Sequence, residues 1–190
     1  MNRALNRTVN LALIAGRSSP LRLLFLALAL ATLALGLTPG LAHSAELVTG
    51  LVVVPAGPLP KSADRRLHDA LATQQGRAVV INFWASWCAP CSEEMPALQR
   101  LSERWRDRGL SVITVAVADN PTNVEDFFWE ISADLPVVSD HEQVISRSWS
   151  ARALPSTVIL DRRHRIRLRG QGPIDWDAAA IDEQLKTLFK

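Results

Sequence analysis

Two cysteines, Cys88 and Cys91, are separated by Ala89 and Pro90. A disulfide between cysteines so close encloses only two residues and removes little entropy from the unfolded chain, so stabilisation is a poor reason for this spacing. At one helical turn apart, however, the second thiol lies within reach of a mixed disulfide formed at the first. The spacing therefore favours reversible thiol–disulfide exchange.

An inert disulfide and a metal site are the alternatives for this pair. Zinc needs about four ligands, and no histidine outside residues 1–44 (His68, His141 and His164) is near the cysteines in sequence. Covalent haem attachment requires a histidine directly after the second cysteine, where this chain has Ser92. Two thiolates suit Cu(I), which prefers soft ligands, so Cu(I) binding stays open. No metal site or cofactor is otherwise expected.

The elements around the pair give it a chemical logic. Residues 78–84 form a short apolar, β-rich run typical of a buried strand. A helix is predicted after the cysteines by apolar residues at helical spacing, namely Met95, Leu98, Leu101 and Trp105. Cys88 then lies at a helix N-terminus, where unpaired N–H groups and the helix dipole favour a thiolate. We therefore expect Cys88 to be the nucleophile and Cys91 the resolving thiol.

Strands and helices alternate along the rest of the chain. A strand over 47–54 ends at the turn-rich residues 55–60, and a helix runs from Ser62 to near Gly76. Further strands are predicted over 110–118, 136–138, 157–160 and 166–169, and further helices over 121–131, 140–149 and 175–190. This order indicates a three-layer α/β domain.

The residues around the cysteines resemble a known family. Residues 83–91 (FWASWCAPC) resemble the active site of thioredoxin-fold proteins, and residues 94–98 (EMPAL) resemble the exported TlpA-like and ResA-like thiol–disulfide oxidoreductases. The resemblance covers about residues 77–177 and continues through 136–140, 154–161 and 170–176. It implies a thioredoxin-like fold, with a mixed central sheet and helices on both faces.

The resemblance also implies roles for residues beyond the cysteines. Pro155 matches a cis-proline that faces the pair, and the backbone of Leu154 before it would bind an extended client segment. Glu94 matches an acidic residue that tunes the thiol pKa values and accepts a proton; the alternative is a helix-end acid favoured by the dipole. Asn82 stands where thioredoxin has a buried aspartate and cannot exchange protons, which gives Glu94 more weight.

Six tryptophans divide into two expected groups. Trp84 and Trp87 flank the cysteine motif, and we expect them to wall an apolar client surface. The others are expected to pack in the core: Trp105, Trp129, Trp149 and Trp176.

Arginines alternate along the last predicted hairpin, at Arg163, Arg165, Arg167 and Arg169. A period of two places them on one face of a strand. This pattern predicts a solvated face that protects a sheet edge. The alternative is a docking surface for acidic clients.

Residues 1–44 differ from the rest of the chain. An uncharged apolar run of 15 residues, 23–37, follows Arg22 and precedes small residues near Ala45, as in a secretory signal. This run is short for a membrane span of about 17–25 residues, although 21–41 approaches that length. Residues 1–44 are therefore predicted to be a signal peptide or N-terminal membrane anchor, and 45–190 a thioredoxin-like domain in the periplasm or on the extracytoplasmic face of the membrane.

Composition and charge exclude several classes of protein. The 190 residues are 48% hydrophobic and 21% charged, unlike a disordered or collagen-like chain. Four of the 21 basic residues and none of the 19 acidic ones lie in residues 1–44, so the net charge of +2 becomes about −2 beyond them. Overall charge therefore does not support a nucleic-acid partner.

The expected function is reduction of disulfides in exported client proteins. Ala89 and Pro90 place no charge between the cysteines, which favours a reductant over a strong oxidant. The resemblance implies a membrane electron donor of the DsbD type and, as possible clients, apocytochrome c and metal-site assembly proteins. A Cu(I) metallochaperone and a thiol oxidant are the alternatives. A peroxidase is disfavoured by Ala85, where a hydroxyl would be expected.

Overall fold

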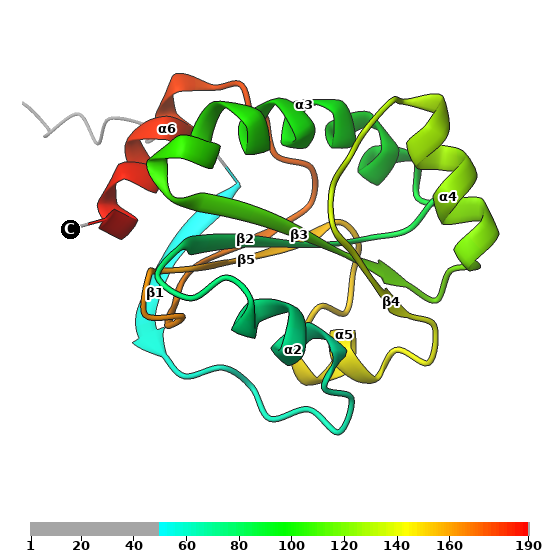
Figure 1. Ribbon diagram of the computed structural model, residues 1–190, viewed down its shortest axis with the longest axis horizontal. Coiled ribbons are helices and arrows are strands. Elements are labelled where there is room, and N and C mark those ends of the chain that lie inside the picture. The colour runs from blue at the N-terminus through cyan, green and yellow to red at the C-terminus, as the bar shows by residue number, and fades with distance from the viewer. Residues whose placement is uncertain (1–49, 190) are drawn as a thin grey trace, which may run out of the picture. The chain divides into compact units, whose positions relative to one another are not determined.

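A mixed β-sheet of six strands forms the centre of the computed structural model, which describes residues 50–189 (Figure 1). The strands lie in the order β1-β6-β5-β2-β3-β4. β2, β3 and β4 are parallel, whereas the pairs β2–β5, β5–β6 and β6–β1 are antiparallel. The strands are β1 (Leu51–Gly57), β2 (Ala78–Trp84), β3 (Leu110–Val117), β4 (Val137–Asp140), β5 (Ser156–Leu160) and β6 (Ile166–Gln171).

Helices cover both faces of this sheet (Figure 1). α3 and α6 lie on one face, with α4 toward the β4 edge, and α2 and α5 lie on the other. The helices are α2 (Arg66–Ala72), α3 (Ala89–Trp105), α4 (Pro121–Glu130), α5 (Val144–Ser148) and α6 (Ala179–Lys186), with 3-10 turns at Arg106–Arg108 and Thr187–Phe189. This arrangement confirms the mixed central sheet with helices on both faces that the resemblance implied.

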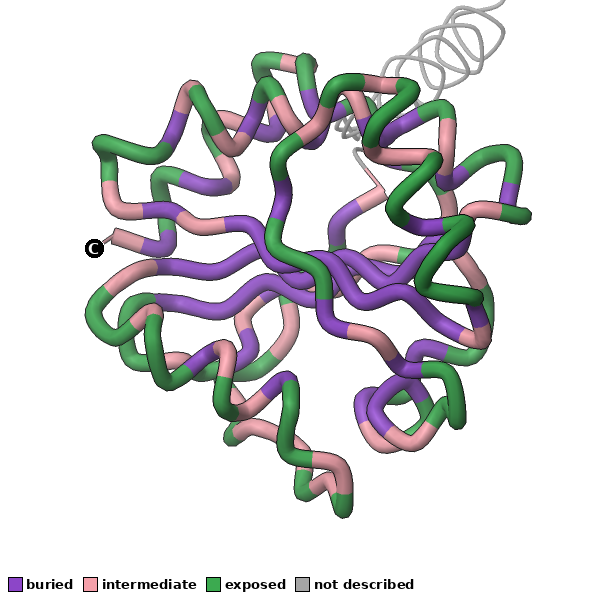
Figure 2. Tube along the Cα trace, turned by 45° about the vertical axis from the view of Figure 1, so that its right-hand side comes forward, coloured by how far each residue is buried: buried purple, intermediate pink, exposed green. Residues whose placement is uncertain are grey.

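The central strands are apolar on both faces because helices cover both. Alternate residues of β2 point to opposite sides, so Val80 packs in the cluster beneath α3, whereas Val79 and Ile81 pack in the cluster beneath α2 and α5. β2 is buried along its whole length, and the central strands are correspondingly purple in Figure 2. Burial of this kind explains the near-continuous apolar runs that predicted these strands.

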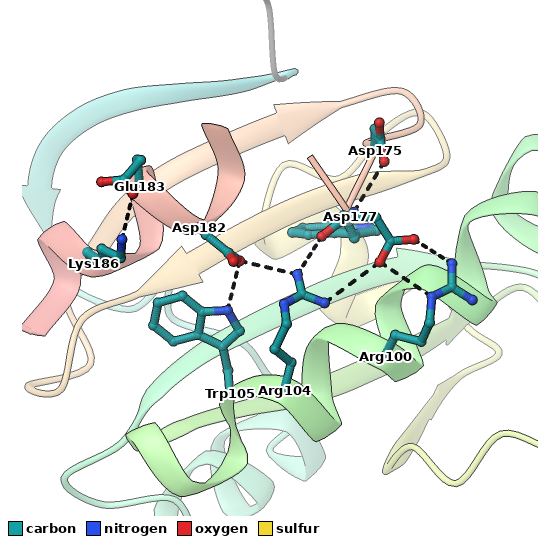
Figure 3. Close-up of polar contacts among 9 residues, drawn as sticks. Arg100, Arg104, Trp105, Asp175, Asp177, Asp182, Glu183 and Lys186 are labelled. Atoms are coloured by element: carbon teal, nitrogen blue, oxygen red, sulfur yellow. Dashed lines mark hydrogen bonds and ion pairs between the residues drawn. The ribbon is translucent and has the colours of Figure 1, made fainter. Parts of the chain in front are cut away.

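Polar contacts join α3 to α6 and the loop before it (Figure 3). Arg100 Nη2 lies 2.5 Å from the Asp177 carboxylate, and Arg104 Nη2 lies 3.2 Å from that of Asp182. Trp105 donates from Nε1 to Asp182 at 2.9 Å. Exposed ion pairs contribute little free energy each. We therefore regard these contacts as fixing the position of α3, while apolar burial supplies most of the stability.

The first strand is shifted from its predicted position. β1 continues through Pro55 into the segment predicted as a turn, whereas residues 47–49 lie outside the described part of the chain. Proline lacks an N–H, but β1 is an edge strand whose register shifts between Val53 and Gly57. At such a position no ladder hydrogen bond from the proline is required.

α2 is shorter than the helix predicted from Ser62 to near Gly76. Ser62 does not cap it, and the Ser62 hydroxyl has no hydrogen-bond partner among the described residues. The Asp64 carboxylate instead accepts a hydrogen bond from the N–H of Arg66 at 3.0 Å. An acidic side chain satisfies a free amide of the first turn as well as serine does, so the helix begins later.

The helix predicted over 140–149 is only partly correct. Asp140 belongs to β4, which pairs with β3, and α5 occupies the later half of the predicted range. The fully buried Asp140 carboxylate accepts hydrogen bonds from the N–H groups of Ile145 and Ser146, at 2.9 and 2.7 Å. One side chain therefore ends the strand and satisfies unpaired amides of the helix that follows.

The alternating arginines do not protect a sheet edge, because β6 lies between β1 and β5. Arg163 lies in the turn before β6. Arg165 and Arg167 lie 2.8 and 3.5 Å from the Asp161 carboxylate, and Arg169 donates to a backbone carbonyl at the C-terminal end of α5. Three of the four guanidinium groups are therefore occupied within the domain.

Residues 1–49 lie outside the described part of the chain, so the signal peptide or anchor stays a prediction. The chain divides into the units Met1–Glu46 and Leu47–Lys190, and the fold above belongs to the second. Within residues 50–189, no helix is both long enough and apolar enough to cross a membrane.

We predict that Asp140→Ala lowers the free energy of unfolding by about 1–3 kcal/mol, because two amides of α5 lose their buried acceptor. Urea unfolding followed by tryptophan fluorescence measures this change. Asp134→Ala is the matched control, since Asp134 is exposed in the loop before β4, and should shift the value by less than about 0.5 kcal/mol. Equal stability of the two variants would contradict the prediction.

Candidate active site

The two cysteines lie at the junction between β2 and α3. Cys88 is the N-cap of α3 with an extended backbone, and Cys91 lies in the first turn. They form a disulfide with an S–S distance of 2.08 Å and a Cα–Cα distance of 5.3 Å. Cys88 is 7% exposed and Cys91 is fully buried, so Cys88 is the residue that meets solvent. The predicted placement at a helix N-terminus is confirmed.

Asp119, just after β3, holds the loop that leads into the disulfide. Its carboxylate accepts hydrogen bonds from the backbone N–H of Ser86 at 2.5 Å and from the Ser86 hydroxyl at 3.0 Å. The indole N–H of Trp87 donates to the carbonyl of Ala118 at 3.3 Å. The sequence analysis missed Asp119. Because β2 and β3 are parallel, an acidic residue following β3 lies at the same sheet edge as the cysteines, and that signal was available.

The two tryptophans of the motif have different environments. Trp87 is 62% exposed beside the disulfide. Trp84 was expected to wall the same surface, but it is fully buried, and its ring centroid lies 5.0 and 5.2 Å from those of Phe127 and Phe128. Trp84 is the last residue of a strand covered on both faces, so it belongs to the core.

Trp129 also differs from its expected place. It is 87% exposed on α4 and lines a cavity of about 610 Å³ between α4 and β4, together with Phe128, Leu135 and Val137. The three tryptophans that are buried as expected are Trp105, Trp149 and Trp176. The expectation that Trp129 packs in the core was based only on its apolar type. Its position on α4 is exposed and gives it no core contact, so that expectation was wrong.

The Leu154–Pro155 peptide bond is cis, as the resemblance implied. The carbonyl of Pro155 accepts a hydrogen bond from the N–H of Gly172 at 2.9 Å. Leu154 is half-buried and packs against the apolar cluster that contains both cysteines. Leu154 and Trp87 line one cavity of about 540 Å³, so two predicted client-binding residues come together in space.

Glu94 lies on α3 one turn after Cys91 and is only 5% exposed. Its Oε1 accepts a hydrogen bond from Asn82 Nδ2 at 2.8 Å, and its Oε2 accepts one from the N–H of Ile174 at 2.9 Å. The indole N–H of Trp176 also favours the ionised form of this carboxyl, although it forms no hydrogen bond with it. This buried position is unlike that of a solvated acid at a helix end.

Burial raises the pKa of the Glu94 carboxyl above its ordinary value. The hydrogen bonds from Ile174 and Asn82 oppose this shift without cancelling it. A carboxyl group with a raised pKa is better matched to proton transfer near neutral pH than an ordinary glutamate. Asn82 donates its other hydrogen to Thr157 Oγ1 at 3.3 Å and holds the carboxylate from β2.

Among residues 50–189, no group of three or more histidine, cysteine or acidic side chains is placed to hold a metal ion. His68 packs against an indole ring. His141 and His164 have ring nitrogens 3.2 and 3.1 Å from the backbone carbonyls of Asp119 and Gln74. Each histidine therefore contacts a different part of the domain.

A cysteine pair at the start of the helix after the central strand, with a cis-proline before β5, defines a thioredoxin-like protein. The chain belongs to the Redoxin family, whose model matches residues 53–185. It is 29% identical over 97 residues to the thiol-disulfide oxidoreductase ResA of Geobacillus thermodenitrificans, covering 51% of this chain. The match spans 56% of that relative, or about half its length.

Solved structures agree with this assignment. A secreted thiol-disulfide isomerase from Corynebacterium glutamicum is similar with a TM-score of 0.57 and 26% identity, over 62% of this chain and 74% of that one. StoA from Bacillus subtilis is similar with a TM-score of 0.51 and 25% identity, over 61% of this chain and 84% of that one. The resemblance to ResA-like, thioredoxin-fold proteins is therefore confirmed.

We predict that Glu94 makes the stability of the protein depend on pH. The folded state holds the Glu94 pKa above its unfolded value, so protonation of Glu94 stabilises the folded state. This stabilisation is fully present below the ordinary glutamate pKa. It is lost as the pH rises through the raised pKa. Urea unfolding between about pH 4 and pH 8 should therefore show the wild type losing stability relative to Glu94→Gln.

Glu93→Gln is the matched control, because Glu93 is the exposed neighbour of Glu94 on the same helix. The free energy of unfolding of Glu93→Gln should follow that of the wild type across this pH range. If the difference in the free energy of unfolding between the wild type and Glu94→Gln stays constant with pH, the raised pKa is contradicted.

Proposed function

We propose that this chain is a thiol–disulfide oxidoreductase that reduces disulfides in exported client proteins. The observation that carries the proposal is the Cys88–Cys91 disulfide at the N-terminus of α3, with only Cys88 open to solvent. The amides and dipole at that end of the helix favour a thiolate at Cys88 when the pair is reduced. The names of the matched ResA protein and of the secreted isomerase favour disulfide exchange over Cu(I) binding.

The reaction transfers two electrons to the client. The reduced Cys88 thiolate attacks one sulfur of a client disulfide, and the other client sulfur leaves as a thiolate. Cys91, after losing its proton, then attacks the Cys88 sulfur of this mixed disulfide and releases the second client thiol. The protein is left with the Cys88–Cys91 disulfide that the structure holds.

Glu94 is the proposed acceptor of the Cys91 proton during this second attack. It lies one turn from Cys91 on α3, it is buried, and its pKa is raised. Asn82 lies beside it and donates to Glu94 and Thr157, but a neutral amide does not take up a proton near neutral pH. Glu94 is thus the carboxyl group that the geometry offers for general base catalysis.

The client is proposed to bind along Trp87, Leu154 and Pro155. Trp87 offers an exposed aromatic surface directly before Cys88. The backbone at Leu154, before the cis-proline, would pair with an extended client segment as an added strand does. Shared lining of one cavity by Trp87 and Leu154 supports this placement.

The proposed location is the periplasm or the extracytoplasmic face of the membrane, where residues 1–44 act as a signal peptide or anchor. A reductant there needs a supply of electrons, for which a membrane carrier of the DsbD type is proposed. Cytochrome c biogenesis, with apocytochrome c as client, is the proposed pathway. The apolar leader and the uncharged Ala89 and Pro90 support these assignments.

We predict that Cys91→Ser traps clients on Cys88, because the mixed disulfide forms but the resolving thiol is missing. Incubating the reduced variant with a disulfide-bonded peptide should give an adduct that dithiothreitol releases, as mass spectrometry can show. Cys88→Ser is the control and should give no such adduct.

In the reduced wild type near neutral pH, we predict that iodoacetamide labels Cys88 faster than Cys91, because the end of the helix favours a thiolate at Cys88. Faster labelling of Cys91 would reverse the roles.

We predict that Glu94→Gln slows release of the mixed disulfide by about tenfold to a hundredfold, the lower range of general base catalysis. Removing a nearby negative charge should also lower the pKa of the Cys88 thiol. Single-turnover kinetics on a disulfide-bonded peptide and a pH titration of thiolate absorbance measure the two effects. Glu93→Gln, at the exposed neighbour, should change neither. Wild-type behaviour of Glu94→Gln in both measurements would exclude Glu94 as the proton acceptor.

A further inference from the structure

Two arginines line the cavity beside the proposed redox site. Trp87, Leu154 and both arginines line this cavity of about 540 Å³. Arg147 lies in α5, and Arg152 lies in the loop that follows it. Acidic residues are absent from its lining. The proposed client-binding surface is therefore positively charged on this side.

Neither guanidinium group has a carboxylate partner among residues 50–189. Arg147 Nη2 donates to the backbone carbonyl of Glu142 at 2.5 Å, whereas the Glu142 carboxylate is directed to His141, 3.9 Å away. Arg152 is exposed and forms no ion pair within the described part of the chain. Several other arginines of the domain pair with carboxylates, namely Arg65, Arg66, Arg100, Arg104, Arg165 and Arg167. Two cations at the cavity thus stay available to a ligand.

The charge of the surface changes sign across the loop between β3 and α4. Ala118 lines the arginine cavity, and the next residue, Asp119, lines the larger cavity beside α4. Beyond the buried Asp119, residues 120–134 contain four exposed acidic residues and no lysine or arginine. A negatively charged client segment is therefore attracted to the side of Arg147 and Arg152 and repelled from α4.

The arginine cavity is lined by the residues that directly precede Cys88 and Pro155. Trp87 directly precedes Cys88, and Leu154 directly precedes Pro155. When the client cysteine bonds to the Cys88 sulfur, residues next to it in the client lie over Trp87 and Leu154. We therefore expect a carboxylate one or two residues from that cysteine to face the cavity that Arg147 and Arg152 line.

We propose that Arg147 and Arg152 form a carboxylate-binding subsite that selects clients with an acidic side chain beside the reactive cysteine. This inference rests on the proposed function and names the substrate class of the same site. Planar guanidinium groups bind carboxylates with two parallel hydrogen bonds, which suits them to this recognition.

Three synthetic peptides test the proposal, each with one disulfide and identical except for Glu, Gln or Lys beside the first cysteine. The second-order rate of their reduction by the reduced protein is measured by tryptophan fluorescence. We expect the order Glu, Gln, Lys, with the Glu peptide roughly tenfold faster than the Lys peptide at low ionic strength. At about 1 M salt, where the screening length falls to about 3 Å, this preference should largely disappear.

Arg147→Glu combined with Arg152→Glu should reverse the order, so that the Lys peptide becomes the fastest. Arg163→Glu is the control, because Arg163 is exposed in the turn before β6 and lines neither the arginine cavity nor the cavity beside α4. Arg163→Glu should keep the wild-type order. The Gln peptide, measured with every variant, separates a general loss of activity from a change of charge preference.

The outcomes distinguish the two proposals. Equal rates with the three peptides in the wild type would overturn the subsite and leave the proposed oxidoreductase function standing. A preference for Glu that survives in the double variant would also overturn the subsite. Failure to reduce any of the peptides, together with no adduct on Cys91→Ser, would overturn both.

Discussion

The carboxylate of Asp119 holds Ser86 by its amide and by its hydroxyl, and the geometry of the disulfide depends on this contact. β2 ends at Trp84 and α3 begins at Ala89, so only four residues make the turn from strand to helix. Asp119 is itself buried, and hydrogen bonds to a charged acceptor are stronger than those between neutral groups. Cys88 is therefore presented at the end of α3 by a short loop with little freedom, and Trp87 beside it stays at the surface.

The Glu94 carboxyl, one turn from Cys91 on α3, is fixed by buried hydrogen bonds in the same way. Burying a carboxylate is costly unless hydrogen bonds replace its water. Here the donors come from β2, through Asn82, and from the backbone at Ile174. The loop that contains Ile174 leads to Asp177 and the start of α6, which the arginines of α3 contact. The carboxyl group is thus held by three parts of the fold while its pKa stays raised.

The two sides of the loop between β3 and α4 differ in charge. The acidic residues of α4 lie on one side of this loop, and Arg147 and Arg152, which have no carboxylate partner among residues 50–189, lie beside Trp87 on the other. Fields of this kind act more on encounter rate and partner choice than on affinity. In the proposed oxidoreductase the chemistry of the two cysteines is general, so we expect client choice to depend on such surrounding groups.

Local sequence patterns alone determined where the cysteine pair lies, at a junction of strand and helix, and the α/β class of the fold. The signals were features of neighbouring residues: the spacing of the two cysteines, the apolar run before them and the helical periodicity after them. The structure confirms the close pair, the strand and the helix that these signals predicted. The resemblance added the cis bond at Pro155, which the structure contains.

Only the tertiary structure decided which side chains surround that site. Ser86 and Asp119 are 33 residues apart in sequence, and Glu94 and Ile174 are 80 apart. Trp84 and Trp87 are alike in type and three positions apart, yet one is buried beneath α4 and the other is exposed. Burial, the pKa of a carboxyl and the pairing of an arginine depend on what packs against a residue from distant parts of the chain. Local periodicity carries no record of those contacts.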